Sequence, residues 1–183
     1  MTMSSSVIIP HVPYSMTYHL STNVILSTAQ ALAALQALAC DEEERSVLAP
    51  VLCRQRQGMF ALMVRNAFAD VVLRLGPLVL DTSLDGETPD TAPDDAEMSG
   101  VPDYEMWVEL LTPRSFSSTR HGIVRRALEQ AVAFAALEAW CSGSASGERS
   151  AMSERFASLA TRWQRTVVSA LSPEVYPTIR QEG

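Results

Sequence analysis

The chain has 183 residues, of which 47% are hydrophobic. That is enough apolar material for one substantial core and gives little reason to expect a second domain. The formal net charge is −7 at pH 7, but residues 81–103 carry eight carboxylates and no basic residue, so the remainder sums to +1. A protein that binds duplex nucleic acid needs a basic surface stripe, and the residues outside 81–103 are nearly neutral in sum. Direct nucleic-acid binding is therefore not expected.

Neither a disulfide framework nor a membrane segment is indicated. Cys40, Cys53 and Cys141 are odd in number, have no C-x-x-C spacing and lie in apolar segments, which predicts reduced core thiols in a cytoplasmic protein. Residues 1–13 lack a positively charged start and contain two prolines, unlike a signal peptide. The long apolar run 59–80 is interrupted by charged residues, so no membrane span is expected.

The first half of the chain predicts one strand followed by helices. Residues 14–20, YSMTYHL, alternate apolar and polar side chains, as a half-buried strand does. Ser21 or Asn23 then caps a helix rich in Ala, Leu and Gln that ends near Cys40.

A second helix opens at Asp41. This residue is an N-cap, because three glutamates follow it at the positive end of the helix dipole. A metal site is the weaker interpretation, since consecutive carboxylates on a helix point in different directions. Pro50 is expected to kink or restart the helix, and Gly76-Pro77 to end it. Its apolar face consists of Phe60, Val64, Ala67, Phe68, Val71 and Leu75.

Residues 81–103 predict a long solvated loop. Their proline, glycine and aspartate content makes the segment too polar to offset the entropy lost on ordering. An acid cluster built for catalysis is the less favoured interpretation, because paired carboxylates need rigid placement and an environment that shifts a pKa.

The second half predicts a strand and two helices. Residues 104–111, YEMWVELL, alternate again and are expected to pair with the first strand. A third helix, capped by a residue within 117–119, runs to about Cys141 and is apolar on most faces, as a central helix is. After a turn at 142–147, a fourth helix returns antiparallel along it. The apolar positions of this last helix are Met152, Phe156, Leu159, Ala160, Trp163, Val167 and Leu171.

The predicted fold is therefore mainly α (α+β). We expect a four-helix bundle-like domain over residues 14–172, with a two-stranded antiparallel β element and the long acidic loop. A flexible N-terminal arm, 1–13, precedes it, and a C-terminal tail, 173–183, follows.

No catalytic residue, cofactor or metal site is predicted. His11, His19 and His121 lack metal-ligand spacing, and the sequence has no phosphate-binding glycine loop and no nucleophile elbow. Along the third helix His121 and Cys141 would lie about 30 Å apart, too far for a nucleophilic pair. A hydrolase with an unrecognised site beside His121 remains a further hypothesis.

Arginine is the remaining candidate for function, since all 14 basic residues are Arg. The absence of Lys has two alternative explanations: codon bias, or the suitability of the planar guanidinium group for interfaces. The arginines near the third and fourth helices are either a solvated surface or an interface that meets the acidic segment of another copy. The candidate interface residues are Arg114, Arg120, Arg125, Arg155, Arg162, Arg165, Asp85, Glu87, Asp94 and Asp95.

The order of elements over residues 14–172 resembles a known group of proteins. It is carried by the stretches MTYHLSTNVIL, DEEER, YEMWVELLTPRSF, ALEAW and MSERFASLATRWQRTVVSAL, with Pro113 and Trp140 among them. They are similar to small uncharacterised proteins from the virion-structural gene modules of Bacteroidetes tailed phages and prophages. The long acidic segment and the absence of a basic run after Pro173 depart from that group.

The resemblance implies a non-enzymatic virion structural protein. Such a subunit would be a head–tail connector or neck protein, made in the host cytoplasm and assembling as a ring of identical copies in contact with portal and tail or neck proteins. A different hypothesis is a cytoplasmic helical adaptor or regulator that binds a basic partner through its acidic loop.

Overall fold

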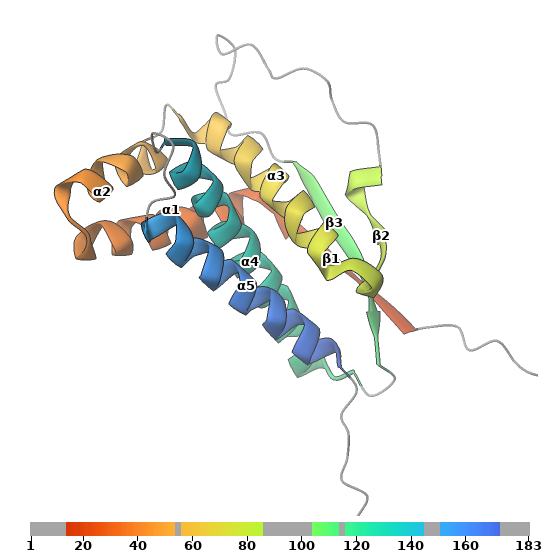
Figure 1. The fold of residues 1–183 in the computed structure, drawn as a ribbon. Coiled ribbons are helices and arrows are strands. Elements are labelled where there is room, and N and C mark those ends of the chain that lie inside the picture. The colour runs from red at the N-terminus through yellow and green to blue at the C-terminus, as the bar shows by residue number, and fades with distance from the viewer. Residues whose placement is uncertain (1–13, 54–55, 86–103, 114–115, 145–150, 173–183) are drawn as a thin grey trace, which may run out of the picture.

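A small antiparallel sheet packs against a set of helices in the computed structural model, which describes residues 14–53, 56–85, 104–113, 116–144 and 151–172 (Figure 1). The mainly helical class with a small sheet agrees with the prediction. The predicted arm, most of the acidic loop and the tail lie outside the described residues. The elements follow the order β1 (Tyr14–Ser21), α1 (Thr22–Ala39), α2 (Glu42–Leu48), η1 (Ala49–Leu52), α3 (Gln57–Leu75), η3 (Gly76–Leu78), β2 (Val79–Thr82), η4 (Ser83–Asp85), β3 (Glu105–Thr112), α4 (Ser118–Ser144) and α5 (Ala151–Leu171).

The sheet has three strands, so the prediction of two was wrong. The strand order is β1-β3-β2, and β3 pairs antiparallel with both neighbours. The missed strand β2 includes Asp81, where the acidic loop was expected to begin. Thr82 anchors this strand, because its side chain is buried and its Oγ1 donates a hydrogen bond to the carbonyl oxygen of Trp107 (3.1 Å).

Helices α1, α2 and α3 form where the sequence predicted helices, but their ends differ in detail. Asp41 caps α2, since its Oδ1 accepts a hydrogen bond from the backbone nitrogen of Glu44 (2.9 Å). Ser21 occupies the N-cap position of α1, but its side chain makes no capping hydrogen bond. Pro50 lies in η1, so the chain ends α2 and starts α3 afresh rather than kinking one helix. The predicted apolar face of α3 is buried at every position.

Helix α4 occupies the centre of the molecule, as its apolar composition predicted. It contacts α1, α2, α3, α5 and β1. Ser117 caps it, accepting a hydrogen bond from the backbone nitrogen of Arg120 (3.3 Å), and the helix runs three residues past Cys141. Helix α5 returns antiparallel beside α4 (Figure 1), with the rings of Phe134 and Phe156 6.1 Å apart.

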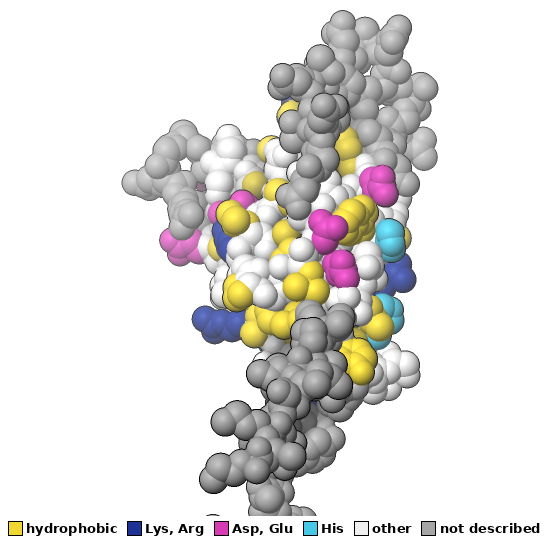
Figure 2. Space-filling view, turned by 90° about the vertical axis from the view of Figure 1, so that its right-hand side faces the viewer, with side chains coloured by type: hydrophobic (Ala, Val, Ile, Leu, Met, Phe, Trp, Pro, Cys, Tyr) yellow, Lys and Arg dark blue, Asp and Glu magenta, His cyan; other side chains and the backbone are white. Residues whose placement is uncertain are grey.

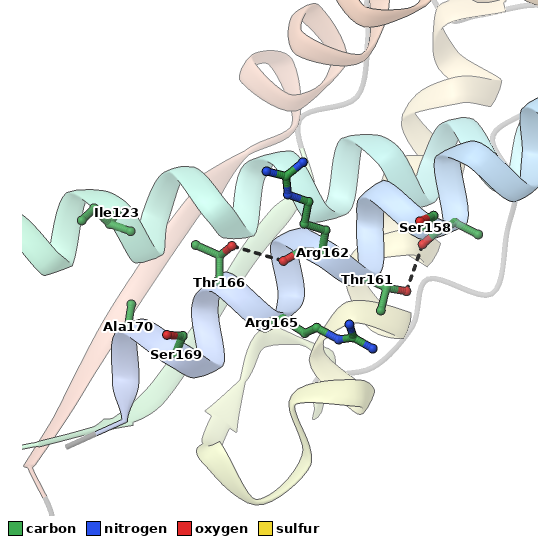
Figure 3. A pocket seen from close by; sticks show the side chains of 9 residues that line it. Ile123, Ser158, Thr161, Arg162, Arg165, Thr166, Ser169 and Ala170 are labelled. Carbon is green, nitrogen blue, oxygen red and sulfur yellow. Dashed lines mark hydrogen bonds between the residues drawn. The ribbon is translucent and has the colours of Figure 1, made fainter. Parts of the chain in front are cut away.

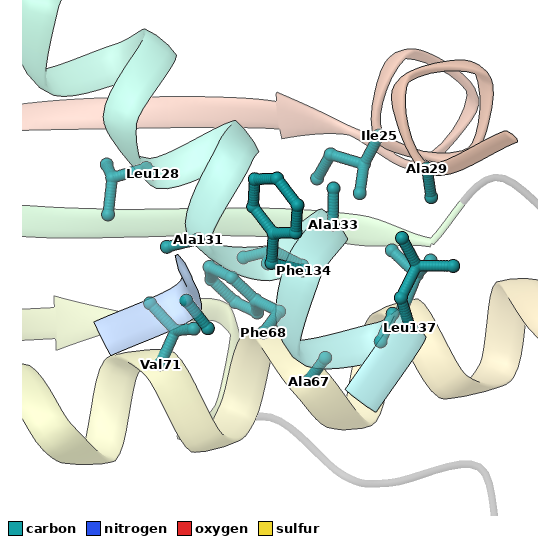
Figure 4. Packing of buried hydrophobic residues seen from close by; sticks show 14 of the residues in the cluster. Ile25, Ala29, Ala67, Phe68, Val71, Leu128, Ala131, Ala133, Phe134 and Leu137 are labelled. Carbon is teal, nitrogen blue, oxygen red and sulfur yellow. The ribbon is translucent and has the colours of Figure 1, made fainter. Parts of the chain in front are cut away.

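The core lies where α1, α3 and α4 meet the inner face of the sheet. Figure 4 shows Ile25 of α1, Phe68 of α3 and Phe134 of α4 converging there. Burying such side chains stabilises the fold by roughly 1.5–3 kcal/mol each. At its far end the indole nitrogen of Trp140 donates to the carbonyl oxygen of Val47 (2.9 Å), which ties α4 to α2.

The cysteine prediction was correct only in part. Cys141 is buried in the core, but Cys40 is half-buried and Cys53 is exposed. Cys53 directly follows η1, in the connection between α2 and α3. All three thiols are free, as predicted.

Candidate interaction surfaces

The outer side of α5 carries three of the predicted interface arginines. Its buried residues recur at three- and four-residue steps, and Arg155, Arg162 and Arg165 lie on the opposite, exposed side. Within the described residues, these three guanidinium groups form no ion pair and no hydrogen bond. They are therefore available to an outside anion.

Arg162 and Arg165 line an open groove of about 850 Å³ between α5 and the start of α4 (Figure 3). We call it the arginine groove. The hydroxyl groups of Thr161 and Thr166 donate to carbonyl oxygens one turn earlier on α5, at 2.9 and 3.1 Å, so the guanidinium groups are the strong free donors there. Among the described residues its wall contains no acidic side chain and consists of Ile123, Ala157, Ser158, Thr161, Arg162, Arg165, Thr166, Ser169 and Ala170.

Of the other predicted interface residues, those that the structure describes do not line this groove. Arg125 is exposed on α4 and pairs with Glu129 one turn away (Nε to Oε1, 3.2 Å). It lines a separate depression of about 400 Å³ beside His19 and Glu105. Arg120 is half-buried in the first turn of α4. Asp85 ends η4, while Arg114, Glu87, Asp94 and Asp95 lie outside the described residues.

The histidine and the thiol considered for catalysis lie in different surroundings. The ring of His121 stacks on that of Tyr18, with centroids 4.9 Å apart, and His121 lines neither depression. Cys141 lies near the opposite end of α4, where burial, reinforced by Glu138 and Glu44, raises the pKa of its thiol to about 12. Among the described residues no three His, Cys, Asp or Glu side chains gather as metal ligands do.

The outer face of the sheet carries both polar and apolar side chains, since only the other face of this antiparallel sheet is buried. On it His19 lies opposite Trp107, and Thr17 opposite Glu109, across β1 and β3. The hydroxyl group of Ser15 donates to Glu109. Figure 2, which faces this side of the molecule, shows acidic side chains beside hydrophobic ones with histidine at the edge.

A second surface, on α1, was not predicted. Over its 18 residues α1 contains no charged side chain, although most of the helix is not buried. Its exposed leucines include Leu35 (65% exposed) and Leu38 (83%), with Val24 at 45%. The sequence does show an uncharged stretch at α1, but such a stretch alone does not tell which side of the helix is exposed to solvent. We define the α1 seam as Val24, Thr28, Ala31, Leu35 and Leu38.

By length and composition alone, α1 is also the one helix of the described residues that could cross a membrane. A core helix can pass the same test, and the inner side of α1, including Ile25 and Ala29, is packed in the core. Comparison with family models, with curated proteins and with solved structures found no match to this chain.

Proposed function

We propose that this protein is a non-catalytic structural subunit of a tailed-phage virion, of the head–tail connector or neck type, which assembles with its own copies in a ring. The observation that supports self-assembly is the arginine groove, where two exposed guanidinium groups lie without a counter-ion among the described residues. The phage neck context comes from the resemblance in element order, and portal and tail or neck proteins are the other expected neighbours.

The same chain carries the complement of this groove. Residues 81–103 hold eight carboxylates, including Glu87, Asp94 and Asp95. If the arginine groove of one copy binds the acidic segment of the next, the contact joins two different surfaces and is heterologous. Such contacts close into a ring when the rotation from one copy to the next is a whole-number fraction of a full turn. Opposite charges also steer the two surfaces together and set their register.

The test is a charge-swap experiment on the full chain. Arg162→Glu/Arg165→Glu and Asp94→Arg/Asp95→Arg should each reduce self-association, whereas a mixture of the two variants should associate again because the swapped charges are complementary. Light scattering coupled to size exclusion and electron microscopy report the size of the assembly. Association should weaken as salt rises, since the contact is between exposed charges.

A control variant separates the groove from net charge. Arg56→Glu/Arg74→Glu makes the same change in charge around α3, outside the groove, and should assemble like the wild type. A wild-type chain that stays monomeric at high concentration and low salt, and that also fails to bind portal or tail proteins, would refute the proposal. Loss of a basic partner from the Asp94→Arg/Asp95→Arg variant alone, with normal behaviour of the groove variant, would instead favour the adaptor hypothesis.

A further inference from the structure

The five positions of the α1 seam follow the spacing of a coiled-coil contact. Val24, Thr28, Ala31, Leu35 and Leu38 are separated by steps of four, three, four and three residues, an average of 3.5. Ala31 lies two residues, about half a turn, from the buried Ala29 and Ala33, so the seam faces away from α3 and α4. A helix side with this period is shaped to receive another helix.

We propose that the α1 seam binds the α1 seam of a second copy of this chain, with the two helices antiparallel across a two-fold axis. This inference does not depend on the ring proposal, because it uses a different surface and an isologous contact. The seam is suited to self-pairing because it carries no charge, so two identical surfaces meet without like-charge repulsion. Depletion of charged residues is also what distinguishes the centre of a protein interface from the rest of a surface.

The charges beyond the two ends of α1 favour the antiparallel order. After its C-terminus come Asp41 and the exposed Glu42 and Glu43 of α2, which outnumber the cation beside them, Arg45, whose guanidinium group donates to the carbonyl oxygens of Ala37 and Cys40. Its N-terminus is the positive end of the helix dipole and has no side-chain cap. Arg65 lies in that region over the ring of Tyr104, whereas Arg125, beside Glu105, is already paired with Glu129. An antiparallel pair places the acidic end of each copy toward this positive end of the other.

A second copy fits the seam better than a lipid surface does. A helix that lies on a membrane carries Lys or Arg on its polar side to meet the headgroups, and α1 has neither. Full insertion of α1 would also remove Ile25, Ala29 and Ala33 from the core. The helix is already folded on that core, so pairing loses little backbone entropy. Five seam positions make a small contact, which predicts a weak dimer.

The first test measures dimerisation of the full chain by sedimentation over a range of concentrations. Leu35→Glu/Leu38→Glu should raise the dimer dissociation constant at least about tenfold, because it buries like charges at the contact. The matched control Met59→Glu/Leu73→Glu changes two residues of α3 that are 48% and 78% exposed, and should leave the constant unchanged. Seam pairing should persist at high salt, whereas the groove contact weakens, so failure of one proposal is distinguishable from failure of the other.

The second test checks the geometry by disulfide formation in a Cys40→Ser/Cys53→Ser background, which removes the accessible native thiols. Ala31 is the centre of the seam, so Ala31→Cys should cross-link to itself across the two-fold axis. Leu38→Cys should not cross-link to itself but should cross-link to Val24→Cys when the two variants are mixed. Self-linking of Leu38→Cys would indicate parallel helices and overturn the antiparallel arrangement.

Two outcomes would overturn the inference as a whole. One is a wild-type chain that sediments as a monomer at all salt concentrations while Ala31→Cys fails to cross-link. The other is flotation of the wild-type monomer, but not of Leu35→Glu/Leu38→Glu, with vesicles of phosphatidylcholine alone or mixed with phosphatidylglycerol, which would assign the seam to a lipid surface.

Discussion

The hydroxyl group of Thr22 makes two hydrogen bonds with a single residue far along the chain, accepting from the backbone nitrogen of Tyr104 (3.1 Å) and donating to its carbonyl oxygen (3.2 Å). Thr22 is fully buried and begins α1, while Tyr104 directly precedes β3. The pair therefore fixes the start of α1 against the sheet. It helps to set which side of α1 faces the core and which side carries the α1 seam.

Replacing this hydroxyl with a methyl group should destabilise the fold. Thr22→Val keeps the shape of the side chain but removes the partner of the backbone nitrogen and oxygen of the half-buried Tyr104, which costs about 1 kcal/mol or more in the free energy of unfolding. Urea denaturation measures the loss. Thr22→Ser retains the hydroxyl and should keep most of the stability, so equal stability of Thr22→Val and the wild type would show that the two hydrogen bonds contribute nothing net.

The helices were predictable because burial leaves a period in the sequence. In α3 and α5 the apolar residues recur at three- and four-residue steps, and each expected face is buried or half-buried. Strand β2 was not predictable in this way. It has only four residues, Leu80 and Asp81 are both exposed, and its pairing with β3 is irregular between Val79 and Asp81, so no alternation is left to detect.

The candidate surfaces were predictable to a smaller extent. The arginines of α5 could be placed on its outer side, since the apolar stripe fixes the opposite side. That Arg162 and Arg165 share a groove with Ile123 depends on how α5 lies along α4, which periodicity does not give. The α1 seam was hidden because a helix without charged residues shows little contrast between its buried and exposed sides.

At the N-cap of α2, stability should likewise depend on a single side-chain oxygen, that of Asp41. Asp41→Ala removes the acceptor for the backbone nitrogen of Glu44 and should reduce the free energy of unfolding by about 1 kcal/mol. Asp41→Asn keeps a capping oxygen and should lose much less. Chemical denaturation of the three proteins compares them, and an equal loss for both substitutions would assign the effect to charge rather than to the cap.

Tyr18 should make stability depend on pH in the alkaline range. Burial raises the pKa of its hydroxyl from 10.0 to about 12 in the folded chain, where that group has no hydrogen-bond partner among the described residues. The unfolded chain therefore releases this proton first, so the contribution is fully present below pH 10 and is lost as pH rises toward 12.

The variant Tyr18→Phe isolates this effect. It removes a hydroxyl without a partner, so it should cost little at neutral pH, and its stability relative to the wild type should rise between pH 10 and pH 12. Melting temperatures across that range measure the difference. The same comparison in a Cys141→Ala background removes the thiol, whose pKa is also raised, and a constant difference between Tyr and Phe there would contradict the prediction.

The three thiols should differ sharply in reactivity toward an alkylating reagent such as iodoacetamide. Cys53 is exposed and should react at once, and the half-buried Cys40 more slowly. Cys141 is both buried and held as a thiol by its raised pKa, so it should react only when the chain opens, at least about a thousandfold more slowly than Cys53. Mass spectrometry of digests at timed intervals gives the three rates, and denaturant should bring them together. Modification of Cys141 in step with Cys53 under native conditions would mean that the end of α4 is open to solvent, contrary to its packing against α2 and α5.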